Sequence, residues 1–520
     1  MSVLRFGDMK IHPRFATEHF AVIGASGSGK TTLINAFLAS YLQSNRSYRA
    51  LIYDPKSEML PLLYTLLGVS EQAVCSGHSR VRVLNPYDQR LSAWDLARDF
   101  DSPVSVRELA SILVPQQGEG NSSDSFFRDA LRDILAGIML IFVECVPNPQ
   151  AWRFRDVLLA LLYEPYTRFL LQLDRTRDGR PFPIVHRLRT SYFNEEGDPR
   201  TYANIRATIN TCLSIFEPIA ALSHAAQEAG RCFSLAEWAS RDGQGDILVL
   251  ANDEAARSSL DPYNQALFKR ASELVLARRE ATAQERAHGE NQTLICLDEV
   301  REAGKLEGLG RLLTKGRSKN LCVLLGYQDR DGMAAVYGKE IADEIVGQCN
   351  NIGILKLNNA NTADWASDLF GRRLAHSQGG GSNYDMEGKI SRSHDTGEEE
   401  RPYVFTSDFL YLPPPGPQNG LHGYFRTPDI DPEQHSLRVH IPWAEVEQYR
   451  PQVPEYPQTS WRTAFRPQHA SAQYLTPWDE ADWYRLGLDQ IVGTPVAYDA
   501  KPHHVPTVET QTKTLRTSRT

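Results

Sequence analysis

The stretch GASGSGKT, residues 24–31, decides the fold expected for this chain of 520 residues. It matches the pattern G-x-x-x-x-G-K-[ST] at every defined position, and it lies between a short apolar run, Phe20–Ile23, and a stretch with helical apolar spacing, Thr31–Leu42. Glycines let the backbone curl so that successive N–H groups point at phosphate oxygens, and the following helix adds its positive dipole end. The stretch therefore predicts a nucleotide phosphate cradle, or P-loop, rather than a Gly/Ser-rich surface turn.

The side chains of this stretch have expected roles. Lys30 would reach the β and γ phosphates, and the Thr31 hydroxyl would ligate Mg²⁺. The nucleotide-contacting residues expected from the motif are Gly24, Ala25, Ser26, Gly27, Ser28, Gly29, Lys30, Thr31 and Thr32. ATP and Mg²⁺ are the cofactors that such a site predicts.

A second part of the site is expected where the buried strand Thr293–Leu297 ends in two acids, Asp298 and Glu299. Asp298 would hold the Mg²⁺ shell, and Glu299 would polarise the attacking water. An apolar strand followed by a solvated acidic turn is common by itself. The presence of the P-loop upstream favours the catalytic interpretation.

Two polar side chains fit the same scheme. Gln328 follows the apolar run Leu321–Gly326, and ligands bind at the carboxyl ends of strands in such sheets, so Gln328 could sense the γ-phosphate or position water. Arg317, within Lys315–Lys319, could act as an arginine finger on a neighbouring subunit's nucleotide. From spacing alone, a solvated basic loop is the better account of Arg317, and a strand-end polar residue remains the alternative for Gln328.

Short apolar runs that alternate with helical stretches predict an α/β fold with a mainly parallel, twisted sheet covered on both faces. The expected strands are Phe20–Ile23, Ala50–Tyr53, Val81–Leu84, Asp246–Leu250, Thr293–Leu297, Leu321–Gly326 and Asn351–Leu357. A helix is expected over roughly Pro262–Glu285.

Helical spacing without strand signals predicts an all-helical domain inserted into the sheet domain. Its main stretches are Phe126–Val143, Phe154–Leu173, which Pro165 is expected to break, and Tyr202–Ala225. The domain boundaries expected are 1–104 with 236–425 for the discontinuous nucleotide-binding domain, 105–235 for the insertion, 426–500 for a Pro-rich extension packing on the body and 501–520 for a disordered tail. The polar segment Ser377–Glu400 is expected to be a mobile loop, and Trp478–Val492 to contain a helix.

Composition sets weaker bounds. The net charge of −8 gives no sign of nucleic-acid binding, although a basic surface can be confined to one part of an acidic protein. Seven scattered cysteines without a CxxC pair suggest buried free thiols in a reducing cytoplasm. The N-terminus lacks a signal peptide, and the longest apolar run, Ile134–Val143, is too short to cross a bilayer. A cytoplasmic location is expected, with any membrane contact peripheral or through a partner.

Further motifs, in chain order, resemble the type IV secretion coupling proteins, hexameric ATPases that hand DNA to a conjugation channel. The resemblance covers roughly residues 15–425, and the P-loop itself is shared by many families. The more telling matches are Glu18-His19, Asp54-Pro55-Lys56, Asn85-Pro86, Ser92-Ala93-Trp94-Asp95, Phe126-Phe127-Arg128-Asp129-Ala130, Leu297-Asp298-Glu299, Lys315-Gly316-Arg317-Ser318, Gln328 and Leu410–Pro414.

This resemblance implies a RecA-like motor with an all-helical domain, a homo-hexameric ring and DNA held in its pore without sequence preference. It makes Arg317 the trans-acting finger, in place of the solvated basic loop that spacing alone favours. Relaxase, channel and membrane proteins are the implied partners. Members of the family usually begin with transmembrane helices, whereas this sequence starts at the motor, so either a soluble variant or a related cytoplasmic task is expected. Two alternatives stay open: a DNA pump similar to FtsK and HerA, and an ATPase that recruits protein effectors for secretion.

Overall fold

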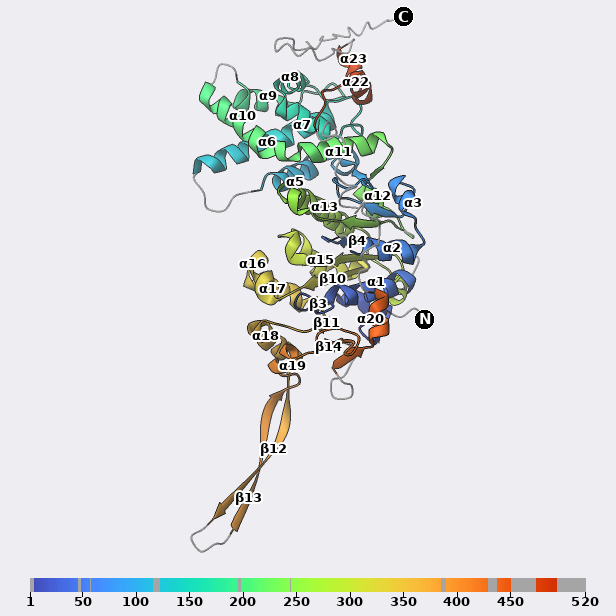
Figure 1. Cartoon of the computed structure of the whole chain (residues 1–520). Coiled ribbons are helices and arrows are strands. Elements are labelled where there is room, and N and C mark those ends of the chain that lie inside the picture. Colours follow the sequence, from blue (N-terminus) through green and yellow to red (C-terminus); the bar gives the residue numbers. More distant parts are fainter. Residues whose placement is uncertain are drawn as a thin grey trace, which may run out of the picture. The chain divides into compact units, whose positions relative to one another are not determined.

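The computed structural model describes residues 4–44, 48–56, 58–115, 122–194, 198–243, 245–384, 390–428, 437–449 and 474–492 (Figure 1). The chain divides into two compact units. The sheet unit comprises Met1–Gly68, Arg279–Lys305 and Leu309–Pro454, and the helical unit comprises Val69–Arg278, Leu306–Gly308 and Glu455–Thr520. These limits differ from the domain boundaries expected from the sequence, which stay a prediction.

The sheet unit is built on buried strands in the spatial order β15-β14-β11-β3-β10-β9-β4. Strands β4, β9, β10, β3 and β11 run parallel, and β14 and β15 add an antiparallel edge. Their bounds are Phe20–Ile23 for β3, Tyr48–Tyr53 for β4, Gln292–Leu297 for β9, Leu321–Tyr327 for β10, Asn351–Ile354 for β11, Leu421–Arg426 for β14 and Arg438–Ile441 for β15. Every residue of the five parallel strands is buried, as expected for a sheet covered on both faces.

Helices flank this sheet on its two sides, with α1 and α20 on one side and α15, α16 and α17 on the other (Figure 1). The longer helices are α1 (Lys30–Ser44), α2 (Leu60–Leu67), α16 (Arg330–Tyr337), α17 (Lys339–Gly347) and α18 (Ala360–Phe370). The shorter elements are β1 (Leu4–Phe6), β2 (Met9–Ile11), α14 (Ala283–His288), α15 (Leu309–Lys315), α19 (Thr406–Leu410) and α20 (Trp443–Tyr449). The predicted α/β class with a mainly parallel sheet is confirmed.

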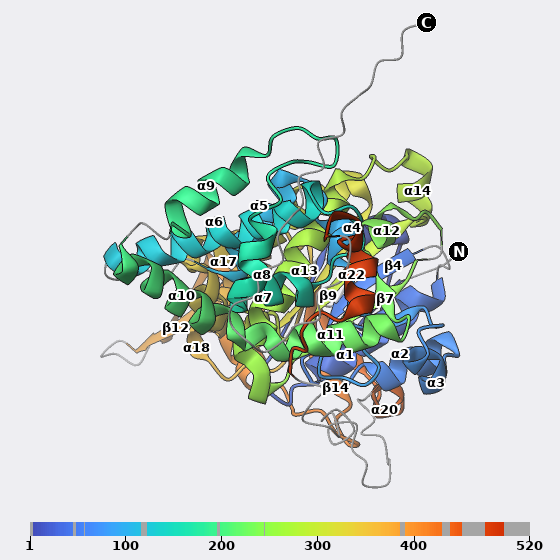
Figure 2. The ribbon, with the colours of Figure 1, turned by 90° about the horizontal axis from the view of Figure 1, so that it is seen from above.

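The helical unit contains a cluster of helices and two small parallel strand pairs (Figure 2). Its helices are α3 (Glu71–Cys75), α4 (Leu96–Asp99), α5 (Pro103–Leu113), α6 (Ser122–Glu144), α7 (Phe154–Leu162), α8 (Glu164–Leu170), α9 (Pro183–Tyr192), α10 (Pro199–Leu213), α11 (Glu217–Glu228), α12 (Leu235–Ser240), α13 (Arg257–Ala277), α22 (Glu480–Leu486) and α23 (Asp489–Val492). The paired strands are β5 (Val81–Val83) with β8 (Ile247–Leu250), and β6 (Ala93–Trp94) with β7 (Cys232–Phe233).

Prolines mark two of the breaks between helices of the helical unit. Pro165 lies in the first turn of α8, so the stretch Phe154–Leu173 forms two helices as predicted. The helical stretch expected over Tyr202–Ala225 is confirmed, and it is divided: α10 ends at Leu213, and α11 begins at Glu217 with Pro218 in its first turn. The helix expected over Pro262–Glu285 is interrupted without a proline: α13 ends at Ala277, and α14 begins at Ala283.

The expectation of a loop over Ser377–Glu400 is wrong. This segment belongs to a long antiparallel hairpin of β12 (Arg372–Tyr384) and β13 (Ile390–Pro402), which extends away from the rest of the sheet unit (Figure 1). The segment is polar and rich in glycine, so its sequence carries no hydrophobic alternation that would reveal the strands.

The C-terminal residues are divided between the two units. β15 and α20 belong to the sheet unit, and α22 packs within the helical unit, where Trp478 Nε1 donates to Asp156 Oδ1 at 2.9 Å. The predicted helix in Trp478–Val492 is confirmed as α22 and α23, while the predicted tail 501–520 lies outside the described residues. The expectation that the cysteines are buried is wrong for Cys75 and Cys232, whose side chains are exposed.

Candidate nucleotide site

The P-loop is the connection between β3 and α1. Gly27 and Gly29 have φ angles of +75° and +92°, in the left-handed region that favours glycine. A Cβ atom on Gly29 would also lie 2.4 Å from Leu421 Cδ1, so a larger residue there would require the Leu421 side chain to move as well as an unfavourable backbone angle. The loop is held at its start by the Gly24 N–H, which donates to the Tyr327 carbonyl at 3.2 Å, and the Ala25 N–H, which donates to the Lys356 carbonyl at 2.9 Å.

Two observations indicate that this loop is shaped for an anion. A Cβ atom placed on Gly27 would meet no atom within 4 Å, so space lies open beside the backbone. The Ser28 hydroxyl is buried, and among the described residues it has no hydrogen-bond partner. A bound phosphate would supply acceptors to the loop N–H groups at the start of α1, where the helix dipole favours negative charge.

Lys30 is the first residue of α1 and pairs with Glu299. Its Nζ lies 2.7 Å from Glu299 Oε1, and both side chains are more than 90% buried, with relative exposures of 5% and 8%. Lys56 Nζ is 3.9 Å from the same oxygen. The lysine that the motif assigns to the phosphates is therefore held, in this structure, by the carboxylate that is the predicted catalytic base.

Thr31 and Asp298 form the second contact between the two motifs. The Thr31 hydroxyl donates to Asp298 Oδ2 at 2.8 Å, and the Glu299 N–H donates to Asp298 Oδ1 at 3.0 Å. Asp298 follows β9 and is buried, and this burial raises the pKa of its carboxyl although the Lys30 charge opposes the shift. One hydroxyl and one carboxylate at hydrogen-bond distance match the oxygen donors that Mg²⁺ takes at P-loops.

Glu299 occupies an unusual backbone position. Its φ and ψ are both 52°, in the left-handed region where a residue with a Cβ is uncommon. The Gln328 amide, at the end of β10, donates to both Glu299 carboxylate oxygens at 3.4 Å. Strained backbone of this kind clusters at functional sites, where the surrounding contacts enforce it.

The residues that line the central cavity only partly match those expected. The cavity has a volume of about 270 Å³. Its lining residues are Ala25, Ser26, Gly27, Gly29, Lys30, Thr31, Thr32, Lys56, Glu58, Glu299, Pro415, Trp443 and Val446. Of the residues expected to act at the site, Gln328 and Asp298 lie just behind this lining, in contact with Glu299.

Asp54, Lys56 and Glu58 were not predicted to act at the site, although they follow β4, the neighbour of β9. Asp54 is buried, and its carboxylate accepts the N–H groups of Glu58 at 3.1 Å and Met59 at 2.8 Å. Burial raises the pKa of Asp54 to about 7. The available signal was positional, because the carboxyl ends of adjacent parallel strands lie at one edge of the sheet.

Arg317 lies apart from this cavity. Its guanidinium is 2.8 Å from Glu18 Oε1, and its side chain is 67% exposed. Glu18 is also fixed by the Asn350 amide, which donates to Glu18 Oε2 at 2.6 Å. The structure therefore presents Arg317 at the surface of the sheet unit rather than at this chain's own P-loop.

The neighbouring His19 has a structural role. Its Nδ1 accepts the Val323 N–H at 3.2 Å, so its Nε2 carries the proton and donates to the Leu313 carbonyl at 3.0 Å. Burial lowers the pKa of His19 to about 4. The imidazole therefore joins β3 to β10 in its neutral form.

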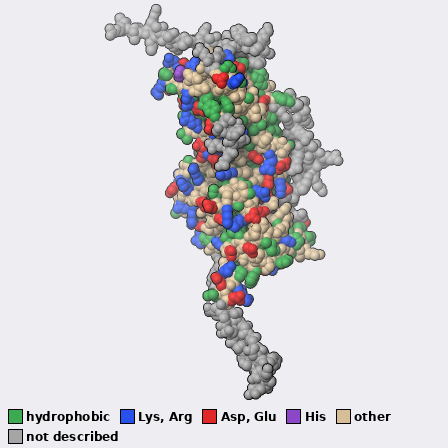
Figure 3. Space-filling view, turned by 90° about the vertical axis from the view of Figure 1, so that its left-hand side faces the viewer, with side chains coloured by type: hydrophobic (Ala, Val, Ile, Leu, Met, Phe, Trp, Pro, Cys, Tyr) green, Lys and Arg blue, Asp and Glu red, His purple; other side chains and the backbone are tan. Residues whose placement is uncertain are grey.

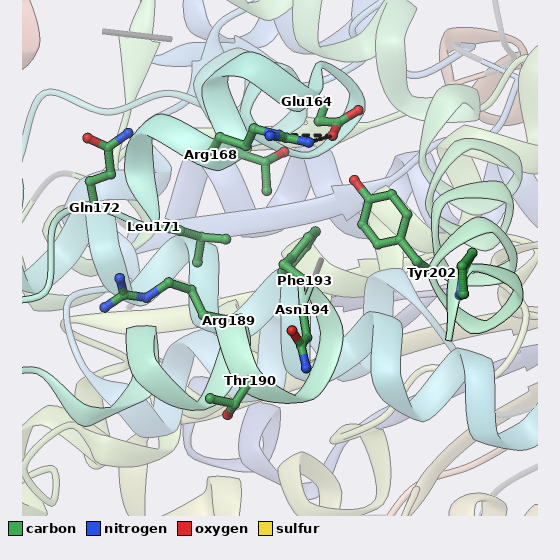
Figure 4. Close-up of a pocket in the computed structure, with 11 residues that line it drawn as sticks. Glu164, Arg168, Leu171, Gln172, Arg189, Thr190, Phe193, Asn194 and Tyr202 are labelled. Carbon is green, nitrogen blue, oxygen red and sulfur yellow. Dashed lines mark hydrogen bonds and ion pairs between the residues drawn. The ribbon is translucent and has the colours of Figure 1, made fainter. Parts of the chain in front are cut away.

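A different cavity, of about 730 Å³, lies among α8, α9 and α10 of the helical unit (Figure 4). Arg168 and Glu164 form an ion pair at 2.7 Å on its wall, and Leu171 and Phe193 supply apolar surface. No motif predicted this cavity, because its lining comes from three helices with ordinary amphipathic patterns.

The described helices include none that combines the length and apolar character needed to cross a membrane. On the face seen in Figure 3, basic and acidic side chains are interspersed.

Comparison with known proteins now adds family information. The sequence profile of the type IV secretion-system coupling protein DNA-binding domain matches residues 3–435. The coupling protein TraD of Escherichia coli (strain K12) is 22% identical over 375 residues, which cover 72% of this chain and 46% of TraD. The chain thus spans about half the length of this curated relative.

Solved structures of the conjugative coupling protein TrwB have a similar fold. The unbound form of TrwBΔN70 matches with a TM-score of 0.55 and 18% identity, covering 85% of this chain and 89% of that one. TrwB in complex with ADP and Mg²⁺ matches with the same TM-score of 0.55, covering 85% of this chain and 88% of that one. The extent of the profile match settles the family, and this chain belongs to the type IV secretion-system coupling proteins.

Proposed function

We propose that this chain is an ATP-driven DNA translocase that acts as a coupling protein, delivering relaxase-bound DNA to a type IV secretion channel. The observation that carries the proposal is the convergence of Lys30, Thr31 and Glu299 on one cavity at the carboxyl edge of a parallel sheet, with Asp298 hydrogen-bonded to Thr31 just behind its lining. Family membership supports the choice of DNA as cargo, since the matching profile is that of a DNA-binding domain.

Nucleotide binding would begin with an exchange of partners at Lys30. Its ammonium group would leave Glu299 Oε1 for the β and γ phosphates, while the loop N–H groups and the Ser28 hydroxyl would bind phosphate oxygens. Thr31 and Asp298 would hold Mg²⁺, which would neutralise the charge that develops on the phosphates. Structures of TrwB with nucleotide analogues and with ADP and Mg²⁺ support the proposal that this chain also binds a nucleotide and Mg²⁺.

Release from Lys30 would free Glu299 to act as the general base. The carboxylate would accept a proton from the attacking water, and the Gln328 amide would orient either that water or Glu299 itself. Hydrolysis would therefore be coupled to nucleotide binding, because the Glu299 carboxylate becomes available only when a phosphate group has replaced it as the partner of Lys30.

Arg317 is proposed to act in trans within a homo-hexameric ring. Its exposure supports this role, since a finger must reach the nucleotide of a neighbouring subunit. DNA in the pore would be held through its phosphates without sequence preference, and binding would weaken as salt rises. The location expected is the cytoplasmic side of the membrane, reached through a partner protein.

Translocation is tested by displacement of a triplex-forming oligonucleotide from double-stranded DNA, and by the equivalent assay on a single strand. ATP-dependent displacement that is absent in Lys30→Ala supports the proposal. ATP hydrolysis without DNA binding, together with co-purification of a secreted protein, would instead select a protein-recruiting ATPase. Displacement by a chain encoded beside a nuclease gene rather than relaxase genes would favour a DNA-processing pump.

A further inference from the structure

The nucleotide cavity also has apolar lining that the phosphate chemistry does not use. Pro415, Trp443 and Val446 provide it, in contrast to the charged lining supplied by Lys30 and Lys56. Trp443 and Val446 belong to α20, and the family match ends at residue 435. The part of the wall that α20 supplies therefore lies outside the matched segment, whereas Pro415 lies within it.

α20 is joined to the rest of the sheet unit by two polar contacts and by a buried apolar side chain. Arg5 Nη2 lies 2.5 Å from Glu445 Oε2, and the Asn35 amide donates to the Tyr449 carbonyl at 2.9 Å. Val446 is buried with 3% exposure. Asn35 lies on α1, the helix that begins with Lys30, so the helix that carries this lysine also packs against α20.

A nucleoside triphosphate has the same division of character as this cavity. Its phosphates require cations and N–H donors, whereas its base offers a flat π-face that stacks on aromatic side chains. Trp443 is half-buried and is one of the residues that line the cavity. The cavity therefore provides the two kinds of surface that the two ends of a nucleotide need.

We infer that α20 forms the nucleoside subsite of this cavity, with Trp443 as the aromatic platform on which a purine base packs. The inference rests on the proposed nucleotide site and adds a specificity to it. ATP and GTP are expected to bind more tightly than CTP and UTP, because a purine offers the larger stacking surface. Glu445 acts as a positioning residue, through its ion pair with Arg5.

The test compares two ligands on the full chain by calorimetry: a non-hydrolysable ATP analogue and inorganic tripolyphosphate, which has no base. Trp443→Ala is expected to raise the Kd of the ATP analogue roughly tenfold, the order found when a stacking aromatic is removed, and to leave that of tripolyphosphate unchanged. Trp443→Phe should retain most of the affinity, which keeps the test usable if the alanine variant does not fold. Glu445→Ala should also raise the Kd of the ATP analogue and leave the Kd of tripolyphosphate unchanged.

The matched control is Trp365→Ala. Trp365 is another half-buried tryptophan of the sheet unit, and its indole contacts the Arg330 guanidinium rather than the cavity. Unchanged analogue binding in Trp443→Ala would overturn the inference while leaving the proposed function intact. Equal weakening of both ligands would also overturn it, because Trp443 would then act on the P-loop. If the unmodified protein bound neither ligand, the proposed function itself would fail.

Discussion

The ion pair between Lys30 and Glu299 leads to a prediction about nucleotide affinity. Because Glu299 holds Lys30 at 2.7 Å, ATP must compete with that carboxylate for the lysine. Both groups are buried, so solvent screens the pair little. A hydrogen bond to a charged group is worth about 2 kcal/mol, which corresponds to roughly thirtyfold in affinity. Glu299→Gln is therefore expected to bind ATP roughly thirtyfold more tightly than the unmodified protein, while its hydrolysis rate falls.

The assay is equilibrium titration with a fluorescent, non-hydrolysable ATP analogue. Removing any negative charge near the phosphates would also raise affinity, so a matched control is needed. Glu58 lines the same cavity, and no ion pair joins it to Lys30 among the described residues. Glu58→Gln should therefore produce a clearly smaller gain. If Glu299→Gln bound the analogue no better than Glu58→Gln, the competition between carboxylate and phosphate would be refuted.

Three further predictions concern acid stability, the trans finger and the C-terminal helix. Because the pKa of His19 is lowered from 6.5 to about 4 in the folded protein, between these pH values the imidazole is protonated in the unfolded chain only. The free energy of unfolding therefore falls as the pH drops below 6.5, by about 2 kcal/mol at pH 5. Denaturant titrations should show this loss in the unmodified protein and not in His19→Asn, and equal losses would contradict it. Arg317→Ala should lower ATPase activity of the assembled protein about a thousandfold with unchanged ATP affinity, whereas Lys319→Ala should not. Arg155→Ala removes the buried partner at 2.7 Å from Asp482 and should cost about 3 kcal/mol of unfolding free energy, seen as a lower Tm; an unchanged Tm would show that the α22 contacts contribute little.

The sequence was sufficient to predict the parts of the site that depend on local patterns. The P-loop and the acids after β9 each follow a short buried strand, and these two motifs can be recognised without knowing how the strands pair. Their meeting could be expected because parallel strands present their carboxyl ends at one edge. The contact of Gln328 with Glu299 follows from the same rule, since β10 pairs with β9.

The remaining parts depend on long-range packing that no local pattern encodes. Trp443 lies at the cavity through the packing of α20, which contacts Arg5 and Asn35, about four hundred residues earlier in the chain. The ion pair between Lys30 and Glu299 was likewise not predicted, since the motif assigns that lysine to phosphate. The hairpin of β12 and β13 escaped prediction because its polar, Gly-rich sequence lacks the alternation that marks a half-buried strand.

The central claim is that this chain hydrolyses ATP in response to DNA. The most direct test measures the ATPase rate with and without DNA at low salt, with particle mass determined by light scattering in the same buffer. We predict hydrolysis that rises on addition of DNA, accompanies assembly into a ring-sized particle and disappears in Lys30→Ala. A rate unchanged by DNA, or one that survives in Lys30→Ala, would contradict the claim.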